Sequence, residues 1–461
     1  MTSERKPIEG IHQEECQPAA KSLGMASEWK THRLGDIVEI FDGPHATPAK
    51  TPHGPVFLGI WNLSDGRLDL SETEHLSEED WNRWSRRVTP RPGDVVFSYE
   101  TRLGEAASIP KGLRCCLGRR MGLLRPRSQD VDGRFLLYAY LGPAFQETIR
   151  ERTVRGSTVD RIPLIEMPEF PITLPVLTEQ RSIAHILSTL DDKIELNRKM
   201  NETLEAMAQA LFQSWFVDFD PVRAKAEGRD PGLPAHIAAL FPGSFEDSEL
   251  GEVPTDWKII SLGDFAEVID CLHSRKPERV EEGLPLLQLG NIRADALLDM
   301  TDTYLITSED YTKWISRMEA SPGNCVVTNV GRVGAVAQIP SDFKAALGRN
   351  MTGIRCRTAY PFPTYLIQAL TSSSMSEEIV RKTDSGTILD SLNVRNIPRL
   401  RIIVPPIQIL ALFERQCRPI RARMEANLKE TSSLAALRDT LLPKLISGGM
   451  HVPAATLEST I

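Results

Sequence analysis

The sequence has few cysteines, and their arrangement offers no framework for disulfides or metals. Seven cysteines occur in 461 residues, without a CxxC pair, and only Cys115 and Cys116 lie close together in the sequence. Neighbouring cysteines bond poorly to each other, and no Cys and His spacing typical of a zinc site is present. A reducing cytoplasm is the location that this pattern favours.

Long apolar runs are also missing. No stretch is long enough to span a bilayer, and no secretory signal peptide is present. The hydrophobic fraction of 41% is sufficient for substantial cores, and the charged fraction of 25% is ordinary for a soluble protein. At 461 residues the chain should contain more than one domain.

Catalytic motifs are absent as well. An amino-methyltransferase would need an Asn/Asp-Pro-Pro-aromatic motif and a glycine-rich cofactor loop, but Pro405-Pro406 follows Val404, which has no polar group. No Gly-x4-Gly-Lys-Ser/Thr phosphate loop occurs. The sequence therefore predicts no catalytic residue, no cofactor and no bound metal.

Two features could still be read as sites. The carboxylates of Asp191, Asp192 and Glu195 resemble a nuclease cluster, but they lie in a heptad pattern, where such charges normally form a solvated flank. His45 and His273 stand at matching positions of a repeat and are expected to lack a nearby cysteine or carboxylate cluster. A structural or DNA-contacting role is thus favoured for both over a metal site.

A heptad pattern predicts a long helix over residues 177–219. Its apolar residues alternate in steps of four and three, as in a coiled-coil seam, and Thr178 can cap its start. Asp220-Pro221 is expected to end it. About 40 residues at ~1.5 Å each give a rod of about 60 Å. The seam contains Ile183, Leu187, Leu190, Ile194, Asn197, Asn201, Leu204 and Leu211.

The same seam recurs 230 residues later, which predicts a second helix over residues 406–447. Apolar residues match apolar ones and polar match polar, so the two helices are expected to be each other's partners. The polar seam positions mark where one inserted heptad per helix, after Asn201 and after Thr431, disturbs the least apolar packing. The matching residues are Phe413, Cys417, Ile420, Met424, Asn427, Thr431, Leu434 and Leu441.

The repeat extends beyond the helices. Trp29 recurs as Trp257, followed in both copies by Leu-Gly-Asp, and Leu117-Gly118-Arg119-Arg120-Met121 recurs as Leu347-Gly348-Arg349-Asn350-Met351. The predicted fold is α+β, with two homologous domains alternating with two long helices that pair as a coiled coil. The expected parts are a disordered tail 1–28, domain 29–176, helix 177–219, linker 220–256, domain 257–405, helix 406–447 and tail 448–461.

Charge is unevenly distributed. The net charge is -8, yet residues 81–127 contain eleven Lys and Arg against three Asp and Glu. A basic face on an acidic body is typical of a protein that touches DNA on one side. An ordinary solvated surface run would give the same asymmetry.

These features together resemble the specificity subunits of type I restriction-modification systems. Each of the two domains opens with Trp-x4-Leu-Gly-Asp and is followed by a long helix. The stretches that carry the resemblance are Leu174–Gln180 and Leu190–Ile194 around the first helix, Leu211–Phe216 at its end, Phe241–Pro242 with Phe245–Gly251 in the linker, and Leu441–Gly448 at the end of the second helix.

The resemblance implies that each domain recognises one half of a split, asymmetric DNA site. It also implies that the two helices pair as an antiparallel coiled coil and set the distance between the halves. It further implies partners: two methyltransferase subunits and one or two ATP-driven restriction and translocase subunits. S-adenosylmethionine and ATP would belong to those partners.

Residues expected to contact DNA come from turns and from differences between the repeats. Arginine can read guanine, but most protein–DNA hydrogen bonds go to the backbone, so both readings stay open. Recurring residues should hold backbone, and differing residues such as Arg120 and Asn350 should read bases. The candidates are His45, Tyr99, Arg102, Arg119, Arg120, Ser157, Thr158, His273, Asn329, Arg332, Arg349, Asn350 and Thr387.

The favoured interpretation is a non-catalytic DNA-recognition scaffold. Alternatives are a recognition component of a fused or type II-like restriction-methylation system, a nuclease or methyltransferase with an unrecognised site, and a coiled-coil protein without a DNA role. The recurring Arg-x-Gly turns at Arg102 and Arg332 argue against the last.

Overall fold

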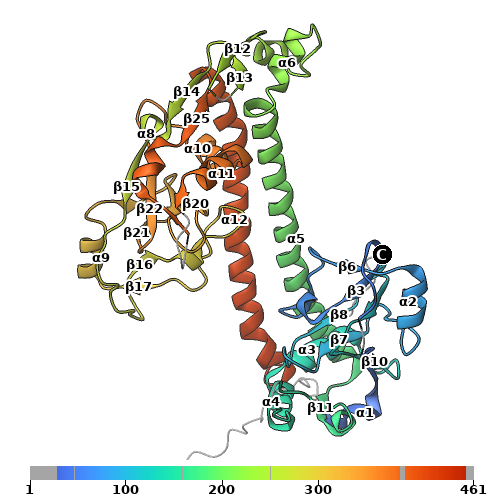
Figure 1. Cartoon of the computed structure of the whole chain (residues 1–461). Helices are drawn as coiled ribbons and strands as arrows, with labels where there is room; N and C mark the ends of the chain where they lie inside the picture. Colours follow the sequence, from blue (N-terminus) through green and yellow to red (C-terminus); the bar gives the residue numbers. More distant parts are fainter. Residues whose placement is uncertain (1–28, 46, 157–158, 250, 385–389, 453–461) are drawn as a thin grey trace, which may run out of the picture. The chain divides into compact units, whose positions relative to one another are not determined.

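A computed structural model of the chain describes residues 29–45, 47–156, 159–249, 251–384 and 390–452. The chain divides into two units, residues 1–190 with 437–461 and residues 191–436. Two long helices, α5 (Leu177–Phe216) and α12 (Ile407–Ile446), each contribute one part to each unit (Figure 1). We call residues 29–176 domain 1 and residues 257–405 domain 2.

Domain 1 is built on two small sheets. An antiparallel sheet has the strand order β2-β10-β7-β8, and a second sheet, β6-β3-β9, pairs β3 with β9 in parallel. The elements are β1 (Lys30–Arg33), α1 (Leu34–Ile37), β2 (Val38–Asp42), β3 (Thr51–Leu58), η1 (Ile60–Asn62), β4 (Leu63–Ser64), β5 (Arg67–Leu68), β6 (Glu74–His75), α2 (Glu78–Trp84), β7 (Val95–Ser98), β8 (Ala106–Ser108), β9 (Cys115–Leu117), β10 (Met121–Pro126), α3 (Gly133–Leu141), α4 (Pro143–Arg152), η2 (Met167–Glu169) and β11 (Pro171–Leu174).

Domain 2 repeats this plan. Its antiparallel sheet has the order β15-β22-β19-β20, and its second sheet, β17-β16-β21-β18, again contains a parallel pair, β16 and β21. The elements are β14 (Lys258–Ser261), α8 (Leu262–Phe265), β15 (Ala266–Asp270), β16 (Leu284–Leu287), η3 (Leu289–Asn291), β17 (Leu305–Ile306), α9 (Ser308–Trp314), β18 (Glu319–Ala320), β19 (Cys325–Thr328), β20 (Val336–Gln338), β21 (Ala345–Leu347), β22 (Met351–Cys356), α10 (Pro363–Thr371), α11 (Ser373–Arg381), β23 (Thr383–Asp384), β24 (Ser391–Leu392), η4 (Val394–Arg399) and β25 (Arg401–Val404).

The helix expected to end at residue 219 ends at Phe216, because Phe219 adopts a left-handed conformation with φ 56°. Pro221 then lies in the first turn of a new helix, where its missing N–H is tolerated. The segment 220–256 is therefore more structured than the sequence indicated. It contains α6 (Asp220–Ala226), α7 (Ala235–Ala238) and the hairpin β12 (Phe245–Ser248) with β13 (Gly251–Pro254).

Within each unit, the helix segments complete the core of the neighbouring domain. In the first unit, Ile183, Leu187, Leu445 and Ile446 join the buried cluster under α3. In the second, Phe216 packs against the rings of Tyr365 and Phe413, each with a centroid distance of 5.1 Å. Burial of these apolar faces stabilises the packing of each helix segment against its domain, although the opposite face of the helix is exposed.

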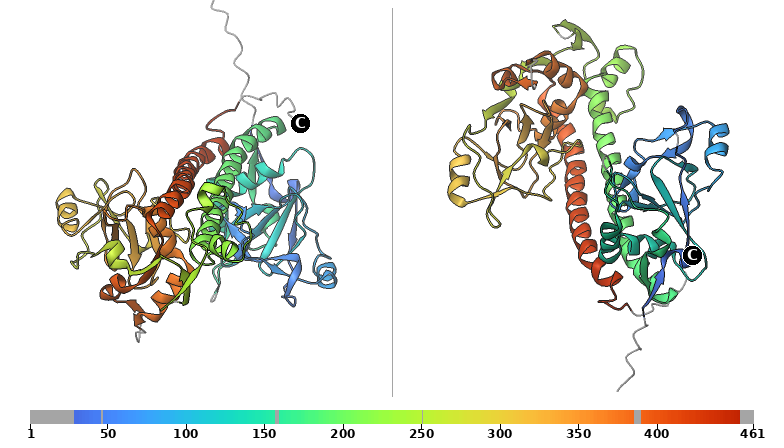
Figure 2. Two further views of the ribbon diagram at one scale, coloured as in Figure 1. Left: turned by 90° about the horizontal axis from the view of Figure 1, so that it is seen from above. Right: turned by 60° about the horizontal axis from the view of Figure 1, so that its bottom comes forward.

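The two helices run antiparallel, as the sequence predicted, with rising numbers on α5 paired to falling numbers on α12 (Figure 2). The fold class is thus confirmed: α+β, with two similar domains alternating with two long paired helices. The structure places the expected seam residues at buried or half-buried positions. No helix among the described residues is long and apolar enough to cross a bilayer.

The middle of the helix pair is polar. The Asn427 side chain donates to Asn201 Oδ1 at 2.8 Å, and the Asn201 side chain donates to the Met424 carbonyl at 3.1 Å. Asn197 donates to Glu430 at 2.8 Å. A buried asparagine in a coiled-coil seam specifies register at a cost in stability, so these bonds set which residues of the two helices face each other.

Arg421 is a deeply buried cation of the second unit, and it links α12 to domain 2. Its side chain is 3% exposed, lies 3.7 Å from Glu205 Oε2 and donates to the Ala296 carbonyl at 3.0 Å. Removing one partner of a buried ion pair leaves an uncompensated charge. We expect Arg421→Ala to lower the free energy of unfolding by about 3 kcal/mol, measured by urea denaturation. Arg423→Ala, at an exposed position nearby, should change it by less than about 0.5 kcal/mol; equal losses would refute the role of burial.

Candidate nucleic-acid interface

Four turns of domain 1 meet at one end of its strands. Gly43 donates its backbone N–H to the Met121 carbonyl at 2.9 Å, and Gly118 donates to the Leu58 carbonyl at 2.6 Å. A side chain on Gly43 or Gly118 would overlap these neighbouring carbonyls, so the close approach requires glycine at both positions. We call this surface turn cluster 1; it comprises residues 42–45, 59–62, 99–104 and 118–121.

Domain 2 has the same arrangement. Cys271 donates its N–H to the Met351 carbonyl at 3.2 Å, and Asn329 donates to the Asn350 carbonyl at 2.8 Å. Tyr99 makes the corresponding bond to the Arg120 carbonyl in domain 1 at 3.1 Å. We call the second surface turn cluster 2; it comprises residues 270–273, 288–291, 329–334 and 348–351.

The two histidines each pair with an aspartate, Asp42 at the end of β2 and Asp270 at the end of β15. His45 Nε2 lies 2.8 Å from Asp42 Oδ2, and His273 Nε2 lies 2.7 Å from Asp270 Oδ2. Both imidazoles are more than half exposed. They therefore stand at the surface of each turn cluster in an orientation that the carboxylate restrains.

An arginine from outside the turn clusters completes each pair. The Arg87 guanidinium lies 3.6 Å from Asp42 and donates to the Gly43 carbonyl at 3.2 Å. The Arg317 guanidinium lies 3.6 Å from Asp270 and donates to the Cys271 carbonyl. We did not single out these arginines from the sequence, although their recurrence 230 residues apart was a signal that could have found them.

The expectation that His273 lacks a neighbouring cysteine or carboxylate was wrong. Among the described residues, Asp270, Cys271 and His273 form one group whose donor atoms lie within 4.8 Å of one another and could hold a metal ion. The surroundings do not favour a cation, because burial raises the pKa of the Cys271 thiol and the Arg317 guanidinium adjoins the carboxylate.

Tyr99 and Asn329 lie inside their domains. Tyr99 is 6% exposed and donates to Asp42 Oδ1 at 2.9 Å; burial, reinforced by this bond, raises its pKa. Asn329 is 5% exposed and bonds the Thr352 hydroxyl at 3.0 Å. Because both side chains are enclosed and hydrogen-bonded, they offer no surface to DNA, and we withdraw them as contact candidates.

Arg102 and Arg332 each bind a neighbouring turn of their own domain. Arg102 Nη1 donates to the Ile60 carbonyl at 3.3 Å, and Arg332 Nη1 donates to the Ile292 carbonyl at 2.7 Å. Arg102 also forms an ion pair with Glu105 at 3.4 Å. The Arg-x-Gly turn at Arg102 joins the antiparallel strands β7 and β8. Both arginines thus stabilise the turn clusters by hydrogen bonds, and their guanidinium groups remain partly exposed.

The turn after β9 or β21 presents the remaining described candidates. Arg119 and Arg349 are exposed, whereas Arg120 and Asn350 are half-buried and adopt left-handed conformations with φ 71° and 64°. Arg120 Nε pairs with Glu100 at 3.0 Å. Such strained positions concentrate at functional sites. Ser157, Thr158 and Thr387 lie outside the described residues.

The acidic stretch of α5 is a solvated flank, as its heptad position indicated. Glu195 pairs with Arg198 at 2.7 Å, and this hydrogen bond lowers the pKa of the Glu195 carboxyl. Lys199 approaches the same carboxylate at 3.5 Å. These pairs occupy the carboxylate with cations of its own helix.

Comparisons with known proteins agree with the motifs. The sequence model of a family described as "Type I restriction modification DNA specificity domain" matches residues 26–206. The HindI specificity subunit of Haemophilus influenzae is 26% identical, covering 92% of this chain and 99% of that protein. The putative MjaX specificity subunit of Methanocaldococcus jannaschii is 22% identical, covering 92% and 94%.

A solved structure shows the same fold. The crystal structure of a type I restriction-modification system S subunit from M. genitalium superposes with a TM-score of 0.59 at 16% identity, covering 92% of this chain and 97% of that one. The resemblance inferred from the Trp-x4-Leu-Gly-Asp openings and the helix motifs is therefore confirmed.

Proposed function

Residues 26–206 belong to the family of type I restriction modification DNA specificity domains, and from this premise we propose that the chain is the sequence-specificity subunit of a type I restriction-modification complex. Domain 1 and domain 2 each bind one half of a bipartite, asymmetric DNA site. The helix pair α5–α12 sets the spacer between the halves and docks the partner subunits. A cytoplasmic location fits this role.

The observation that carries the proposal is the pair of turn clusters. Both are built on an antiparallel sheet of equivalent strand order, β2-β10-β7-β8 and β15-β22-β19-β20, and on equivalent backbone bonds, yet their turn residues differ, as at the half-buried Arg120 and Asn350. A shared framework suits binding to the regular DNA backbone, whereas the differing side chains suit recognition of different base sequences. A shared backbone framework with differing side chains is what two domains need if they are to recognise two different half-sites.

The outer surface of the helices supports partner docking. Leu196 and Met207 on α5 are 52% and 54% exposed, and Leu437 on α12 is 47% exposed. Met207 and Leu437 occupy equivalent positions of the repeat. Exposed apolar residues at repeat-related positions suit two copies of one partner, which supports docking of two methyltransferase subunits. Restriction subunits would then join the assembled complex.

In this assignment the chain supplies recognition and the partners supply chemistry. The sequence contains no phosphate loop or methyltransferase motif, and the Glu195 carboxylate of α5 is paired with Arg198 and Lys199. Methyl transfer with S-adenosylmethionine and ATP-driven cleavage would belong to the methyltransferase and restriction subunits. The purified chain alone should neither methylate nor cut DNA.

Modification-sensitive sequencing of the host genome tests the proposal. We expect a split methylated motif that disappears completely when this gene is deleted and returns when the gene is restored. The control is a strain that lacks the methyltransferase gene but retains this one, which should lack the same motif. Persistence of every split motif after deletion would overturn the assignment.

A further inference from the structure

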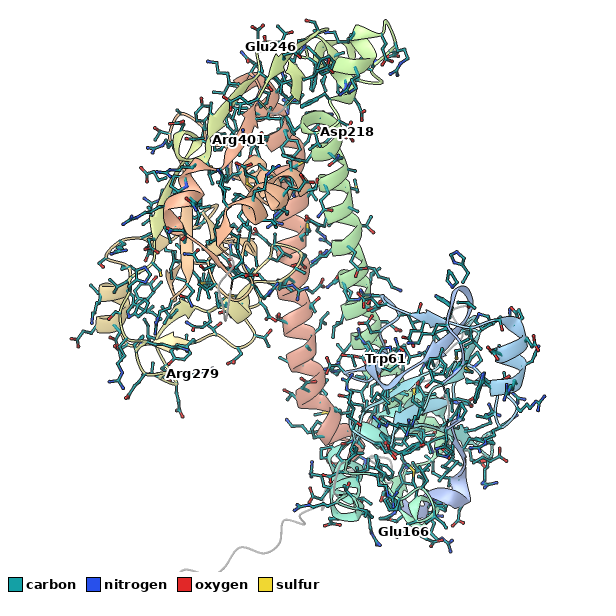
Figure 3. The ribbon with its side chains drawn as sticks, in the orientation of Figure 1. Trp61, Glu166, Asp218, Glu246, Arg279 and Arg401 are labelled. Atoms are coloured by element: carbon teal, nitrogen blue, oxygen red, sulfur yellow. The ribbon has the colours of Figure 1, made fainter. Side chains whose placement is uncertain are left out.

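A tryptophan stands exposed in turn cluster 1 although the recognition candidates from the sequence did not include it. Trp61, in the 3-10 turn η1, is 52% exposed, the largest exposed aromatic side chain of the described residues (Figure 3). Its turn adjoins the others of the cluster, because the Ile60 carbonyl accepts from Arg102 and the Leu58 carbonyl from Gly118. An exposed aromatic at this place points toward a ligand.

The turn that carries Trp61 is rigid. Asn62 is 1% exposed; its Oδ1 accepts from the Gly59 N–H at 2.9 Å, and its side-chain amide donates to the Asp69 carbonyl at 2.9 Å. Domain 2 repeats the device. Asn291 Oδ1 accepts from the Gln288 N–H at 2.8 Å, and its amide donates to the Asp299 carbonyl at 2.8 Å. A rigid turn presents its side chains at a low entropic cost of binding.

The two domains differ in what this shared turn presents. Gly59 of domain 1 corresponds to Gln288 of domain 2, and Trp61 corresponds to Gly290. The large side chain therefore stands at the third position of the turn in domain 1 and at the first position in domain 2. The indole of Trp61 lies over Gly59 so closely that a Cβ on residue 59 would overlap it. The backbone of Gly59 has φ −101° and ψ 167°, which any residue adopts. Glycine is therefore needed there for the indole and not for the backbone.

We propose that this turn is a base-reading position in both domains, with Trp61 reading one base pair of the first half-site and Gln288 one of the second. The inference rests on the proposed function of the chain. An indole offers an apolar face that suits the methyl group of thymine. The amide of glutamine suits the paired donor and acceptor of adenine; in the free protein the half-buried Gln288 amide donates to the Leu287 carbonyl at 2.9 Å, a bond that it would exchange for the base. The same turn thus presents an indole in domain 1 and a glutamine amide in domain 2, which suit different bases.

The test uses the full complex with methyltransferase subunits and a pool of DNA duplexes randomised across both half-sites. After methylation, sequencing reports the preference at every position. Trp61→Ala should lower the preference at one base pair of the first half-site by about tenfold or more and leave the second half-site unchanged. Gln288→Ala should do the same in the second half-site alone.

Gly59→Ala is the sharper variant, because it leaves Trp61 in the chain but removes the space for its indole. We expect it to relax the same base pair as Trp61→Ala. The double replacement Gly59→Gln with Trp61→Gly should move the preference at that pair toward adenine. Ile165→Ala, which truncates a side chain of domain 1 that is 90% exposed outside the turn cluster, is the matched control and should leave the motif unchanged.

The outcomes are separable. A misfolded domain would lower methylation of all duplexes, whereas a lost base contact relaxes one position, and Trp61→Phe should restore most of that preference by its aromatic face. If the wild-type complex selects a bipartite motif but Trp61→Ala and Gly59→Ala select the identical motif, this inference is overturned. If the wild-type complex selects no bipartite motif, the proposed function itself fails.

Discussion

Replacing residues 29–176 by the matching region of a relative with another specificity is expected to exchange one half of the methylated motif completely and to leave the other half as it was. Domain 1 contains a buried cluster made only of its own residues, between Leu58 and Leu123, and its own turn cluster, whose bonds lie within the domain. Bases read by turn cluster 1 should therefore change with the graft, while those read by turn cluster 2 should not.

The structure determines where the graft must end. β1 pairs with β11 through residue pairs that run from Lys30 with Leu174 to Arg33 with Pro171, and a Cβ on Gly35 would lie 2.8 Å from the Pro168 side chain. A junction at Pro168 would separate the partners of this ladder. A junction at Val176, immediately before α5, keeps the ladder within the graft.

Sequencing of methylated DNA from cells that carry the graft and the native methyltransferase reads the outcome. A graft that ends at Pro168 is the control for the junction and should give a less stable protein with weaker methylation of the same hybrid motif. Simultaneous change of both half-sites in the Val176 graft would contradict the assignment of one half-site to each domain.

Features that depend on periodicity and repetition were predictable from the sequence. The heptads located both long helices, and comparison of the halves indicated that one domain plan occurs twice. Features that depend on non-local packing were not. The break between α3 and α4 is one example, because Gly142-Pro143 turns the chain where the Ile446 side chain leaves no room for a Cβ.

In the candidate site, too, repetition in the sequence indicated some features, whereas others depend on non-local packing. Repetition drew attention to the turns, but it could not distinguish an enclosed side chain from an exposed one. Tyr99 reaches Asp42 across 57 residues of sequence, and only the folded sheet brings the two together. Conversely, Trp61 is replaced by glycine at the equivalent position 290 of domain 2, and its exposure in a turn of the cluster became visible only in the folded domain.

Lengthening both helices by one heptad is expected to lengthen the spacer of the methylated motif while both half-site sequences stay the same. A heptad adds ~10 Å of helix, which corresponds to about three base pairs at ~3.4 Å each if the helices follow the DNA axis. Whole heptads are required because they keep the apolar seam facing its partner. Methylation could weaken, since three base pairs also rotate one half-site by about a third of a turn.

The antiparallel register changes the design that the sequence alone indicated. Insertion after Asn201 and after Thr431 places the two additions at repeat-related positions, but Asn201 faces Met424 across the seam. With the Thr431 design, the segment between the insertions would lose its partners, including the bond from Asn427 to Asn201. Insertion after Asn201 and directly before Met424 keeps every existing pair on both sides.

The two designs can therefore be compared in cells with the native methyltransferase. The insertion before Met424 should methylate a motif with the longer spacer, whereas the insertion after Thr431 should yield a less stable chain because the buried Asn197 and Asn427 are left without their partners. Insertion into α5 alone is the control and should abolish methylation, since the helices can no longer align. An active complex from the Met424 design that methylates the original spacing would show that the helix pair does not set the distance between the half-sites.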